Sequence, residues 1–326
     1  MQVIIPLAGK GTRLRPHTHL VPKPMLKVAG RPVMDWVMDR LAGLNVTEII
    51  YITGHLKEQV EQYTRSHYKY PSRFIEQKVQ DGTAGAVNLA RPFVKEPVLI
   101  IFVDTVFEAD LTLINRTDAD GIIWAKEVED YQRFGVVVTD KDGYMTKIVE
   151  KPSTPISKLA NIGLYYIKDV EALWKGIDHT LTSPANKGEF YLTDAFQHMI
   201  EHGRKILTAE VGGWYDCGKL DTLLETNETL LRQGHAKRRA FPGVTIIDPV
   251  LIQDGVTIEQ STIGPNVTLE AGTKVSGSTL SHTIVGQQSR IINSTLHHSM
   301  LGDRVVVSGL KASTTLGDDA EVHGDG

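Results

Sequence analysis

The first part of the chain alternates between short apolar runs and amphipathic segments. Residues 3–6, 48–53 and 98–103 are apolar runs that predict buried strands. Residues 33–44 carry apolar side chains at every third or fourth position, which predicts a helix with one buried face. Strands that alternate with helices favour a Rossmann-like α/β fold with a mixed, mostly parallel sheet, whose ligands bind beyond the carboxyl ends of the strands.

The alternation continues through the middle of the chain. Strands are predicted at residues 121–125, 135–139 and 145–149, and helices at residues 195–201 and 222–233. We therefore expect one large α/β domain that ends near residue 236.

The pattern changes after a basic linker at residues 234–243. From Val244 onward, small and β-branched residues recur with glycine at short intervals, as in Ile263-Gly264-Pro265 and Met300-Leu301-Gly302. This is the degenerate hexapeptide repeat, in which one aliphatic side chain in six points into a prism of stacked strands. It resembles left-handed parallel β-helices, with roughly four coils of about eighteen residues. The predicted domains are thus 1–236 and 244–326.

Composition and charge narrow the classes of partner. The 326 residues include 35 Lys and Arg against 39 Asp and Glu, a net charge of -4, which gives no electrostatic reason to expect nucleic acid or an anionic membrane. No apolar run approaches the ~20 residues of a membrane span, and no signal-like segment is evident. The single cysteine, Cys217, excludes an internal disulfide. We expect a cytoplasmic protein that binds phosphate through a few placed cations.

A glycine-rich stretch follows the first predicted strand, with the sequence Leu7-Ala8-Gly9-Lys10-Gly11-Thr12-Arg13-Leu14. Its glycines allow backbone N–H groups to close around an anion, and its arginine adds a planar cation suited to phosphate oxygens. A P-loop is excluded because Thr12-Arg13 stands where Lys-Ser/Thr is required. A dinucleotide-binding loop is disfavoured because Leu14 replaces its third glycine.

The stretch resembles the signature of the sugar nucleotidyltransferases (NDP-sugar pyrophosphorylases). The matching residues are Ala8-Gly9-Lys10-Gly11-Thr12-Arg13 and, further on, Pro22-Lys23. Glucose-1-phosphate thymidylyltransferases and uridylyltransferases with a C-terminal β-helix are the nearest resemblance. It implies that the triphosphate binds to a loop with Arg13 at the leaving pyrophosphate, where Lys10 is a second candidate cation, and with Lys23 at the α-phosphate. The loop residues implied are Leu7, Ala8, Gly9, Gly11, Thr12 and Arg13.

A second stretch, residues 77–86, carries Gln77 five residues before Gly82. A side-chain amide offers the donor and the acceptor that the edge of a pyrimidine requires, and a glycine lets the main chain approach the base. Taken alone, the stretch fits an exposed loop before a helix as well as it fits a nucleobase site. The family resemblance implies that Gln77, Gly82 and Thr83 bind the nucleotide.

Two aspartates are the candidate metal ligands. Asp104 follows a buried strand and Asp216 lies in Trp214-Tyr215-Asp216-Cys217-Gly218, and the resemblance implies that both bind Mg²⁺. Val103 stands where the family usually has glycine, and Lys219 stands where it has a small hydroxyl residue.

The sugar phosphate is expected near the middle of the chain. The resemblance implies that Glu150 accepts from sugar hydroxyls, that Lys151 neutralises the sugar phosphate, and that Asn161 and Gly163 line the sugar. Taken alone, Glu150 and Lys151 are a solvated pair. We interpret Thr193 and Asp194 mainly as helix capping.

The expected reaction joins a nucleoside triphosphate, dTTP or UTP, to a sugar 1-phosphate and releases pyrophosphate. Catalysis would rest on positioning and on charge neutralisation by Arg13, Lys23, Asp104 and Lys151, with Mg²⁺ as cofactor. We also expect a homo-oligomer, a trimer or a tetramer. The alternatives are a bifunctional enzyme whose β-helix transfers acyl groups through a histidine, and a non-catalytic subunit that senses nucleotide sugars.

Overall fold

The computed structural model describes residues 1–186 and 188–324, and the chain divides into two compact units. Unit 1 consists of Met1–Gly9 and Val37–Trp214, and unit 2 consists of Lys10–Trp36 and Tyr215–Gly326. Most of the glycine-rich loop thus belongs to the unit that contains the C-terminal strands. The sequence-based division into domains 1–236 and 244–326 stays a prediction. Within the described residues, no helix combines the length and the apolar character needed to cross a membrane.

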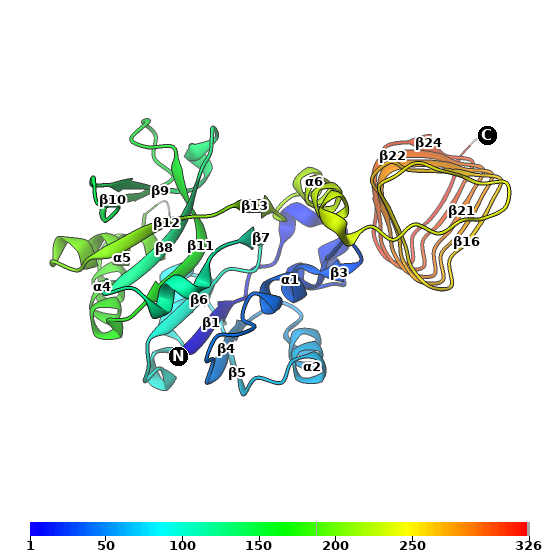
Figure 1. Cartoon of the computed structure of the whole chain (residues 1–326). Helices are drawn as coiled ribbons and strands as arrows, with labels where there is room; N and C mark the ends of the chain where they lie inside the picture. Colours follow the sequence, from blue (N-terminus) through cyan, green and yellow to red (C-terminus); the bar gives the residue numbers. More distant parts are fainter. Residues whose placement is uncertain (187, 325–326) are drawn as a thin grey trace. The chain divides into compact units, whose positions relative to one another are not determined.

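Unit 1 is built on a nine-stranded mixed sheet with the order β10-β9-β11-β6-β1-β4-β5, and β8 joins it beside β11 and carries β12 (Figure 1). Strands β1, β4, β5 and β6 run parallel, whereas β11 is antiparallel to its neighbours. The expected Rossmann-like α/β class is confirmed. The strands are β1 Gln2–Pro6, β4 Glu48–Thr53, β5 Ser72–Glu76, β6 Val98–Ile101, β8 Gly121–Glu127, β9 Gly135–Thr139, β10 Met145–Glu150, β11 Leu159–Ile167 and β12 Ile206–Glu210.

The parallel strands are central because both of their faces are apolar. Residues 3–5 of β1 and 98–101 of β6 are fully buried, as expected for strands covered on two sides. Helix side chains such as Val87, Leu173 and Phe196 pack on this sheet in one hydrophobic core. The helices of unit 1 are α2 Lys57–His67, α3 Thr83–Asn88, α4 Val170–Thr182 and α5 Leu192–Glu201.

The helix predicted at residues 33–44 is shorter than expected. Helix α1 covers Val33–Asp39, and the following residues form turns in which Leu41 N–H donates to the carbonyl of Met38, three residues back. Gly43 has φ +84°, which no helix interior adopts. The apolar spacing continued beyond the helix because the turn residue Leu41 is itself buried.

The C-terminal part of unit 2 is a parallel β-helix with a triangular cross-section (Figure 1). Ile258 pairs with Val275, Val275 with Ile291, and Ile291 with Val307, so equivalent residues recur after 16 or 17 residues rather than the expected eighteen. These four side chains are buried and form one edge of its core. The strands are β14 Thr245–Ile246, β15 Val250–Ile252, β16 Thr257–Glu259, β17 Thr262–Ile263, β18 Val267–Leu269, β19 Lys274–Ser276, β20 Thr279–Val285, β21 Arg290–Ile292, β22 Thr295–Leu301, β23 Val306–Ser308, β24 Lys311–Ala312, β25 Thr315–Leu316 and β26 Glu321–His323.

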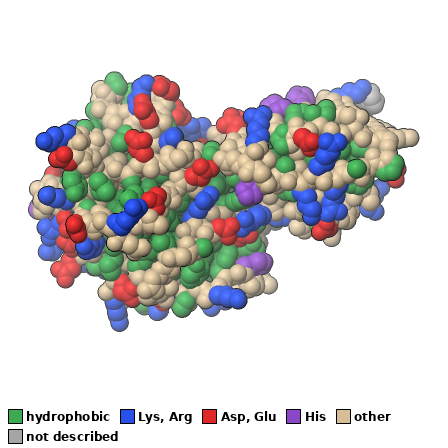
Figure 2. Space-filling view, viewed as in Figure 1, with side chains coloured by type: hydrophobic (Ala, Val, Ile, Leu, Met, Phe, Trp, Pro, Cys, Tyr) green, Lys and Arg blue, Asp and Glu red, His purple; other side chains and the backbone are tan. Residues whose placement is uncertain are grey.

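Unit 2 also holds the short elements on either side of Lys23. Two single turns, η1 Thr12–Leu14 and η3 Lys23–Met25, precede a hairpin of β2 Lys27–Val28 and β3 Arg31–Pro32. Helix α6, Leu220–Leu230, leads into the β-helix. On the face shown in Figure 2, acidic and basic side chains are mixed over both units, in keeping with the small net charge.

Candidate functional site

The start of the glycine-rich loop is fixed by unit 1. Leu7 continues the edge of β1, since its N–H donates to the carbonyl of Ile52 at 2.7 Å. The carbonyl of Ala8 accepts from Gln80 Nε2 at 2.6 Å, and Gly54 lies so close that a Cβ there would be 2.7 Å from this same carbonyl. The predicted residues Leu7 and Ala8 are therefore held at the carboxyl end of a central strand, where α/β sheets bind ligands.

The rest of the loop brings Gly11 and Lys23 together within unit 2. Gly11 adopts φ +61°, and a Cβ on it would lie 3.0 Å from Thr18 Cγ2 and 3.1 Å from Lys23 Cβ. The hydroxyl of Thr18 donates to the carbonyl of Gly11 at 2.8 Å. Thr12 and Arg13 begin the single turn η1 with exposed side chains. The structure thus places a lysine directly beside the loop glycine that the sequence pairs it with.

The predicted nucleobase loop closes on itself in unit 1. Gln77 is 8% exposed, and its amide nitrogen donates to Asp81 Oδ1 at 3.1 Å and to the carbonyl of Gly82 at 3.3 Å. Gly82 has φ +123°, and a Cβ there would lie 2.4 Å from the carbonyl oxygen of Phe190. The hydroxyl of Thr83 accepts from Leu192 N–H at 2.8 Å. Gln77 and Gly82 thus belong to one loop that leads into α3, with Gly82 at the N-cap and Thr83 as the first residue of the helix.

The two candidate metal ligands lie in different units. Asp104 lies in the turn between β6 and β7, Thr105–Glu108, in unit 1. Asp216 belongs to unit 2 at the end of β13, Gly213–Asp216, where its Oδ1 accepts from Gly218 N–H at 2.7 Å. Within the described parts of the chain, no group of three or more His, Cys, Asp or Glu side chains is arranged to hold a metal. A carboxylate is a ligand that suits Mg²⁺, an ion that often completes its shell with water and substrate phosphates.

The sugar-side residues Glu150 and Lys151 form a charged pair at the end of β10. Lys151 Nζ lies 3.6 Å from Glu150 Oε1 and donates to the hydroxyl of Tyr191 at 3.2 Å. Lys151 adopts φ +44°, a left-handed conformation that costs a non-glycine residue about 1–2 kcal/mol. Such strain is retained where the surroundings hold a side chain in place, often at functional sites.

Burial sets the charge balance of this pair. Burial raises the pKa of Glu150, opposed by the Lys151 charge and by the hydroxyl of Thr193, which donates to Glu150 Oε2 at 3.1 Å. For Lys151, burial lowers the pKa, but the hydrogen bond to Tyr191 and the Glu150 charge outweigh it and raise the pKa overall. Lys151 is therefore a cation at neutral pH, ready to meet an anionic group.

Asn161 and Gly163 lie on β11, where the register with β8 shifts between Asn161 and Tyr165. The amide of Asn161 donates to the carbonyl of Gly135 at 2.8 Å, and its oxygen accepts from Tyr165 Oη. Burial, and then the charges on Glu150 and Asp104, raise the pKa of the Tyr165 phenol well above its usual range. The predicted residues Asp104, Glu150 and Asn161 are thus gathered around one buried tyrosine.

Gly163 has a backbone conformation and a close contact that go beyond leaving room for a sugar. It has φ +77°, and a Cβ on it would lie 3.0 Å from Phe102 Cβ. Its carbonyl accepts from Phe102 N–H at 2.9 Å. The glycine therefore permits the irregular backbone of β11 and its close packing on Phe102.

Several residues that position the site were not singled out from the sequence. They are Gln80 at Ala8, Tyr191 at Lys151, and Gly135, where a Cβ would lie 2.3 Å from Asn161 Nδ2 and 2.8 Å from Glu150 Oε2. The capping interpretation of Thr193 is wrong. Thr193 lies inside α5, whose N-cap is Tyr191, and the hydroxyl of Thr193 donates to Glu150. No local pattern identifies these residues, since each contacts a residue on another element of the fold.

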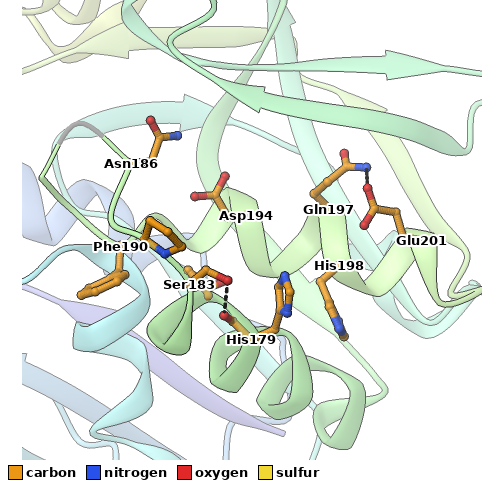
Figure 3. A pocket seen from close by; sticks show the side chains of 10 residues that line it. His179, Ser183, Asn186, Phe190, Asp194, Gln197, His198 and Glu201 are labelled. Atoms are coloured by element: carbon orange, nitrogen blue, oxygen red, sulfur yellow. Dashed lines mark hydrogen bonds between the residues drawn. The ribbon is translucent and has the colours of Figure 1, made fainter.

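A separate cavity of about 230 Å³ lies between α4 and α5 of unit 1 (Figure 3). Asp194, Asn186 and the imidazoles of His179 and His198 line it, and Gln197 donates to Glu201 at its edge. None of the predicted site residues lines this cavity. Burial raises the pKa of Asp194, opposed by its hydrogen bond to Asn186. Asp194 thus lines this cavity, and its charge also contributes to raising the pKa of Glu150.

The fold and these residues together define an α/β protein with a glycine-rich loop and charged side chains at strand ends. The family model of nucleotidyl transferases matches residues 2–233. The chain belongs to the nucleotidyl transferase family, and the resemblance based on residues 8–13 and 22–23 is confirmed.

Similar proteins cover the β-helix as well. The bifunctional protein GlmU of Methanococcus aeolicus is 32% identical over 329 residues, which cover 94% of this chain and 77% of that protein. The glucose-1-phosphate thymidylyltransferase of Streptomyces antibioticus is 28% identical over 323 residues, covering 95% of this chain and 90% of that one. The UTP–glucose-1-phosphate uridylyltransferase AglF of Haloferax volcanii is 31% identical over 223 residues, covering 66% of this chain and 89% of that one.

One solved structure supports the fold assignment. The crystal structure of a UDP-glucose pyrophosphorylase complexed with UDP-glucose superposes with a TM-score of 0.64 at 22% sequence identity. It covers 71% of this chain and 98% of that one. This likeness concerns the fold alone.

Proposed function

We propose that this protein transfers a nucleotidyl group from dTTP or UTP to a sugar 1-phosphate, with glucose 1-phosphate as the first sugar to test. The observation that carries the proposal is the Glu150–Lys151 pair, a half-buried cation beside a largely buried carboxylate in a strained backbone, close to the same tyrosine as Asp104. A surface ion pair has no need of such strain, whereas a site that must hold a phosphate and sugar hydroxyls does. Family membership and the named activities of two relatives support the same reaction.

The reaction is an in-line displacement at the α-phosphorus. A phosphate oxygen of the sugar 1-phosphate bonds to this phosphorus, the bond to the bridging oxygen of the β-phosphate breaks, and pyrophosphate leaves. Two anions must meet, so the protein's main tasks are positioning and charge neutralisation. Lys151 would hold the sugar phosphate, Lys23 the α-phosphate, and Arg13 the leaving pyrophosphate.

The remaining residues would fix the two substrates. Glu150 would accept from sugar hydroxyls beside Asn161 and Gly163. The loop residues Leu7, Ala8, Gly9, Gly11 and Thr12 would offer backbone to the phosphates, and Gln77, Gly82 and Thr83 would border the base. Asp104 and Asp216 would hold Mg²⁺, which when bound neutralises phosphate charge as it shifts between the attacking and leaving oxygens.

The test is release of pyrophosphate. The protein is mixed with Mg²⁺ and pairs from a panel of five triphosphates (dTTP, UTP, ATP, CTP and GTP) and four sugar 1-phosphates (glucose, galactose, mannose and N-acetylglucosamine). We expect turnover with a pyrimidine triphosphate, and none when EDTA removes divalent metal. Tight nucleotide binding with no pyrophosphate from any pair would instead favour a non-catalytic sensor.

Variants connect the activity to the residues. Lys23→Ala and Asp104→Asn should each lower kcat by about a hundredfold or more, the usual loss when a group that stabilises phosphoryl charge is removed. The matched controls are Lys141→Ala and Asp142→Asn, which alter exposed residues of a hairpin turn in unit 1. Pyrophosphate release that stays unchanged in both site variants would refute the assignment.

Acyl transfer by the β-helix is a second candidate function. It is favoured by the relative named as bifunctional, whose similarity covers 94% of this chain, and by His282, whose ring stacks on His298 at 4.9 Å and lies 3.9 Å from Glu228. Histidine side chains gather on the β-helix surface in Figure 2. Acetyl-CoA consumption with an amino-sugar phosphate, abolished in His282→Asn, would establish it.

Three further proposals concern the location of the protein, its self-association and its subunit number. We propose a cytoplasmic homo-oligomer, a trimer or a tetramer, because the flat sides and ends of a β-helix are suitable self-association surfaces. Light scattering coupled to size-exclusion chromatography measures the subunit number, and cell fractionation tests the location. A peak at the mass of a single 36.0 kDa chain would contradict the oligomer.

A further inference from the structure

The segment that carries Arg13 and Lys23 is held by residues from the C-terminal part of the chain. Residues Lys10–Trp36 form one compact unit with Tyr215–Gly326. Polar and close contacts join the two parts at two places, on either side of Lys23. The contacts after Lys23 are the more numerous.

The first contact is an ion pair between a hairpin and the β-helix. Lys27, on β2, donates to the carboxylate of Glu270, which follows β18. Glu270 is only 2% exposed, whereas Lys27 is 28% exposed. A buried carboxylate that loses its cation is costly, so Lys27 is held firmly at this position.

Two side-chain amides hold the turn of the same hairpin. Asn227, on α6, accepts with one oxygen from Ala29 N–H and from the hydroxyl of Thr268, both at 2.8 Å. Gln253 Nε2 donates to the carbonyl of Gly30 at 3.2 Å. The turn residues Ala29 and Gly30 both have positive φ, +46° and +72°, and Asn227 is 1% exposed. The hairpin is thus fixed at its strand and at its turn.

Contacts also exist before Lys23. A Cβ on Gly317 would lie 3.3 Å from Pro16 Cβ, so the last coil approaches the segment closely. His17 is 3% exposed, and its side chain lies near the backbone of Met300. The segment between Arg13 and Lys27 is therefore attached to the β-helix at both of its ends.

A short path leads from the hairpin to the catalytic candidates. Leu26 N–H donates to the carbonyl of Lys23 at 3.2 Å, which closes the single turn η3 immediately before Lys27. Lys23 Cβ in turn is the neighbour of Gly11. A shift of Lys27 would therefore move Lys23 and disturb the loop glycine.

We propose that Glu270 is a positioning residue for nucleotidyl transfer, holding Lys27 and thereby setting the place of Lys23 beside Gly11. This inference rests on the proposed function. It gives the β-helix a task in the reaction, beyond any role in self-association. A displacement of about 1 Å at a reacting group can lower the rate a hundredfold, so a remote clamp of this kind affects catalysis.

The clamp is sensitive to pH. Burial raises the pKa of Glu270 to about 7, the Lys27 charge and hydrogen bond oppose this, and the charges on Asp303 and Asp318 add to it. Above pH 7 the pair is ionic, and below it Glu270 takes up a proton. Glu270→Gln keeps the shape of the side chain and removes this titration.

The kinetic experiment compares three variants of the full chain. Glu270→Gln and Lys27→Met should each lower kcat with the preferred triphosphate about tenfold at pH 8, with the KM of the sugar phosphate unchanged. The double variant should lose little more than either single one, because both break the same pair. Asp319→Asn, which breaks the exposed Arg304–Asp319 pair of the same β-helix, is the control and should keep wild-type activity.

The pH profile separates positioning from a merely structural role. Wild-type kcat should rise between pH 6 and pH 8 by a component that Glu270→Gln lacks, since only the wild type gains the ionic pair in this range. Equal profiles and equal kcat in wild type and Glu270→Gln would overturn the proposal. If Glu270 variants fail to fold, Gln253→Ala tests the same clamp through the Gly30 contact.

Hydrogen exchange gives a readout that does not depend on activity. In Lys27→Met, the amides of residues 23–30 should exchange faster, whereas those of β6 in unit 1 should not change. If the wild type shows no transferase activity but this exchange pattern appears, the proposed function fails and the clamp stands. Unchanged exchange at residues 23–30 refutes the clamp whatever the activity is.

Discussion

Replacement of Gly82 by alanine tests how the nucleobase loop is built. Gly82 has φ +123° and ψ -177°, a conformation that L-residues with a side chain adopt only at a cost of about 1–3 kcal/mol. A Cβ there would lie 2.4 Å from the carbonyl oxygen and 2.6 Å from the nitrogen of Phe190. Ordinary contacts are about 1 Å longer, and backbone cannot rotate out of the way as a side-chain end can. The Phe190 segment must therefore move away.

That movement breaks two hydrogen bonds. Phe190 N–H donates to the carbonyl of Asp81 at 2.8 Å, and the Phe190 carbonyl accepts from Ala84 N–H at 2.9 Å. Each contributes about 0.5–1.5 kcal/mol net. Together with the backbone strain, Gly82→Ala should lower the free energy of unfolding of unit 1 by about 2–6 kcal/mol. Because Gln77 donates to the Gly82 carbonyl, the KM of the triphosphate should rise as well.

Gly43→Ala is the matched control. Gly43 also has positive φ, +84°, but a Cβ there would meet no atom within 4 Å. Only strain of about 1–2 kcal/mol remains in this variant. Urea unfolding followed by tryptophan fluorescence reports mainly on unit 1, which holds Trp124, Trp174 and Trp214. A Gly82→Ala protein as stable as Gly43→Ala, with an unchanged KM for the triphosphate, would refute the reasoning.

Three further predictions concern titrating groups and their partners. Burial lowers the pKa of His17 to about 4. The stability that His17 contributes above pH 6.5 should therefore be lost as the pH falls through 4, by about 3 kcal/mol in all. Urea unfolding at several pH values should show no such loss in His17→Phe. Glu270, whose pKa is raised to about 7, should change stability in the opposite direction. The stability that it contributes below pH 4.5 should fall by up to about 3 kcal/mol as the pH rises through 7. The same urea unfolding of Glu270→Gln should lack this fall. Thr193→Val removes a donor to Glu150, so the pKa of Glu150 should rise further and the acid limb of the kcat/KM profile should move to higher pH, whereas the exposed Thr182→Val should leave the profile unchanged.

Local patterns in the sequence predicted the features that depend on local chemistry. Apolar runs of β-branched residues predicted β1, β4 and β6, because central parallel strands are apolar on both faces. The glycine-spaced repeat after residue 244 predicted the β-helix, since each coil needs an inward aliphatic at a fixed interval. The predicted period of about eighteen residues was slightly too long, because paired residues of successive coils are 16 or 17 positions apart.

The residues that assemble the sugar-side pair were not predictable in this way. Gly135 matters because the backbone of β9 passes within contact distance of Asn161 and Glu150, which only the sheet order β10-β9-β11 brings together. Thr193 has the position and chemistry of a capping residue in the sequence. In the fold, the hydroxyl of Thr193 instead donates a hydrogen bond to the carboxylate of Glu150, 43 residues earlier in the chain.

The largest surprise is the unit to which the glycine-rich loop belongs. A motif that follows the first strand of a sheet is expected to be held by that sheet, and Leu7 and Ala8 are. From Lys10 onward, however, the chain belongs to the unit of the β-helix, and the ion pair between Lys27 and Glu270 joins residues 243 positions apart. The buried acid Glu270 would be costly without a cation beside it, so the two parts of unit 2 stabilise each other. Thr268 and Glu270 are polar and buried on these coils, and each has its partner outside the β-helix, in Asn227 and Lys27.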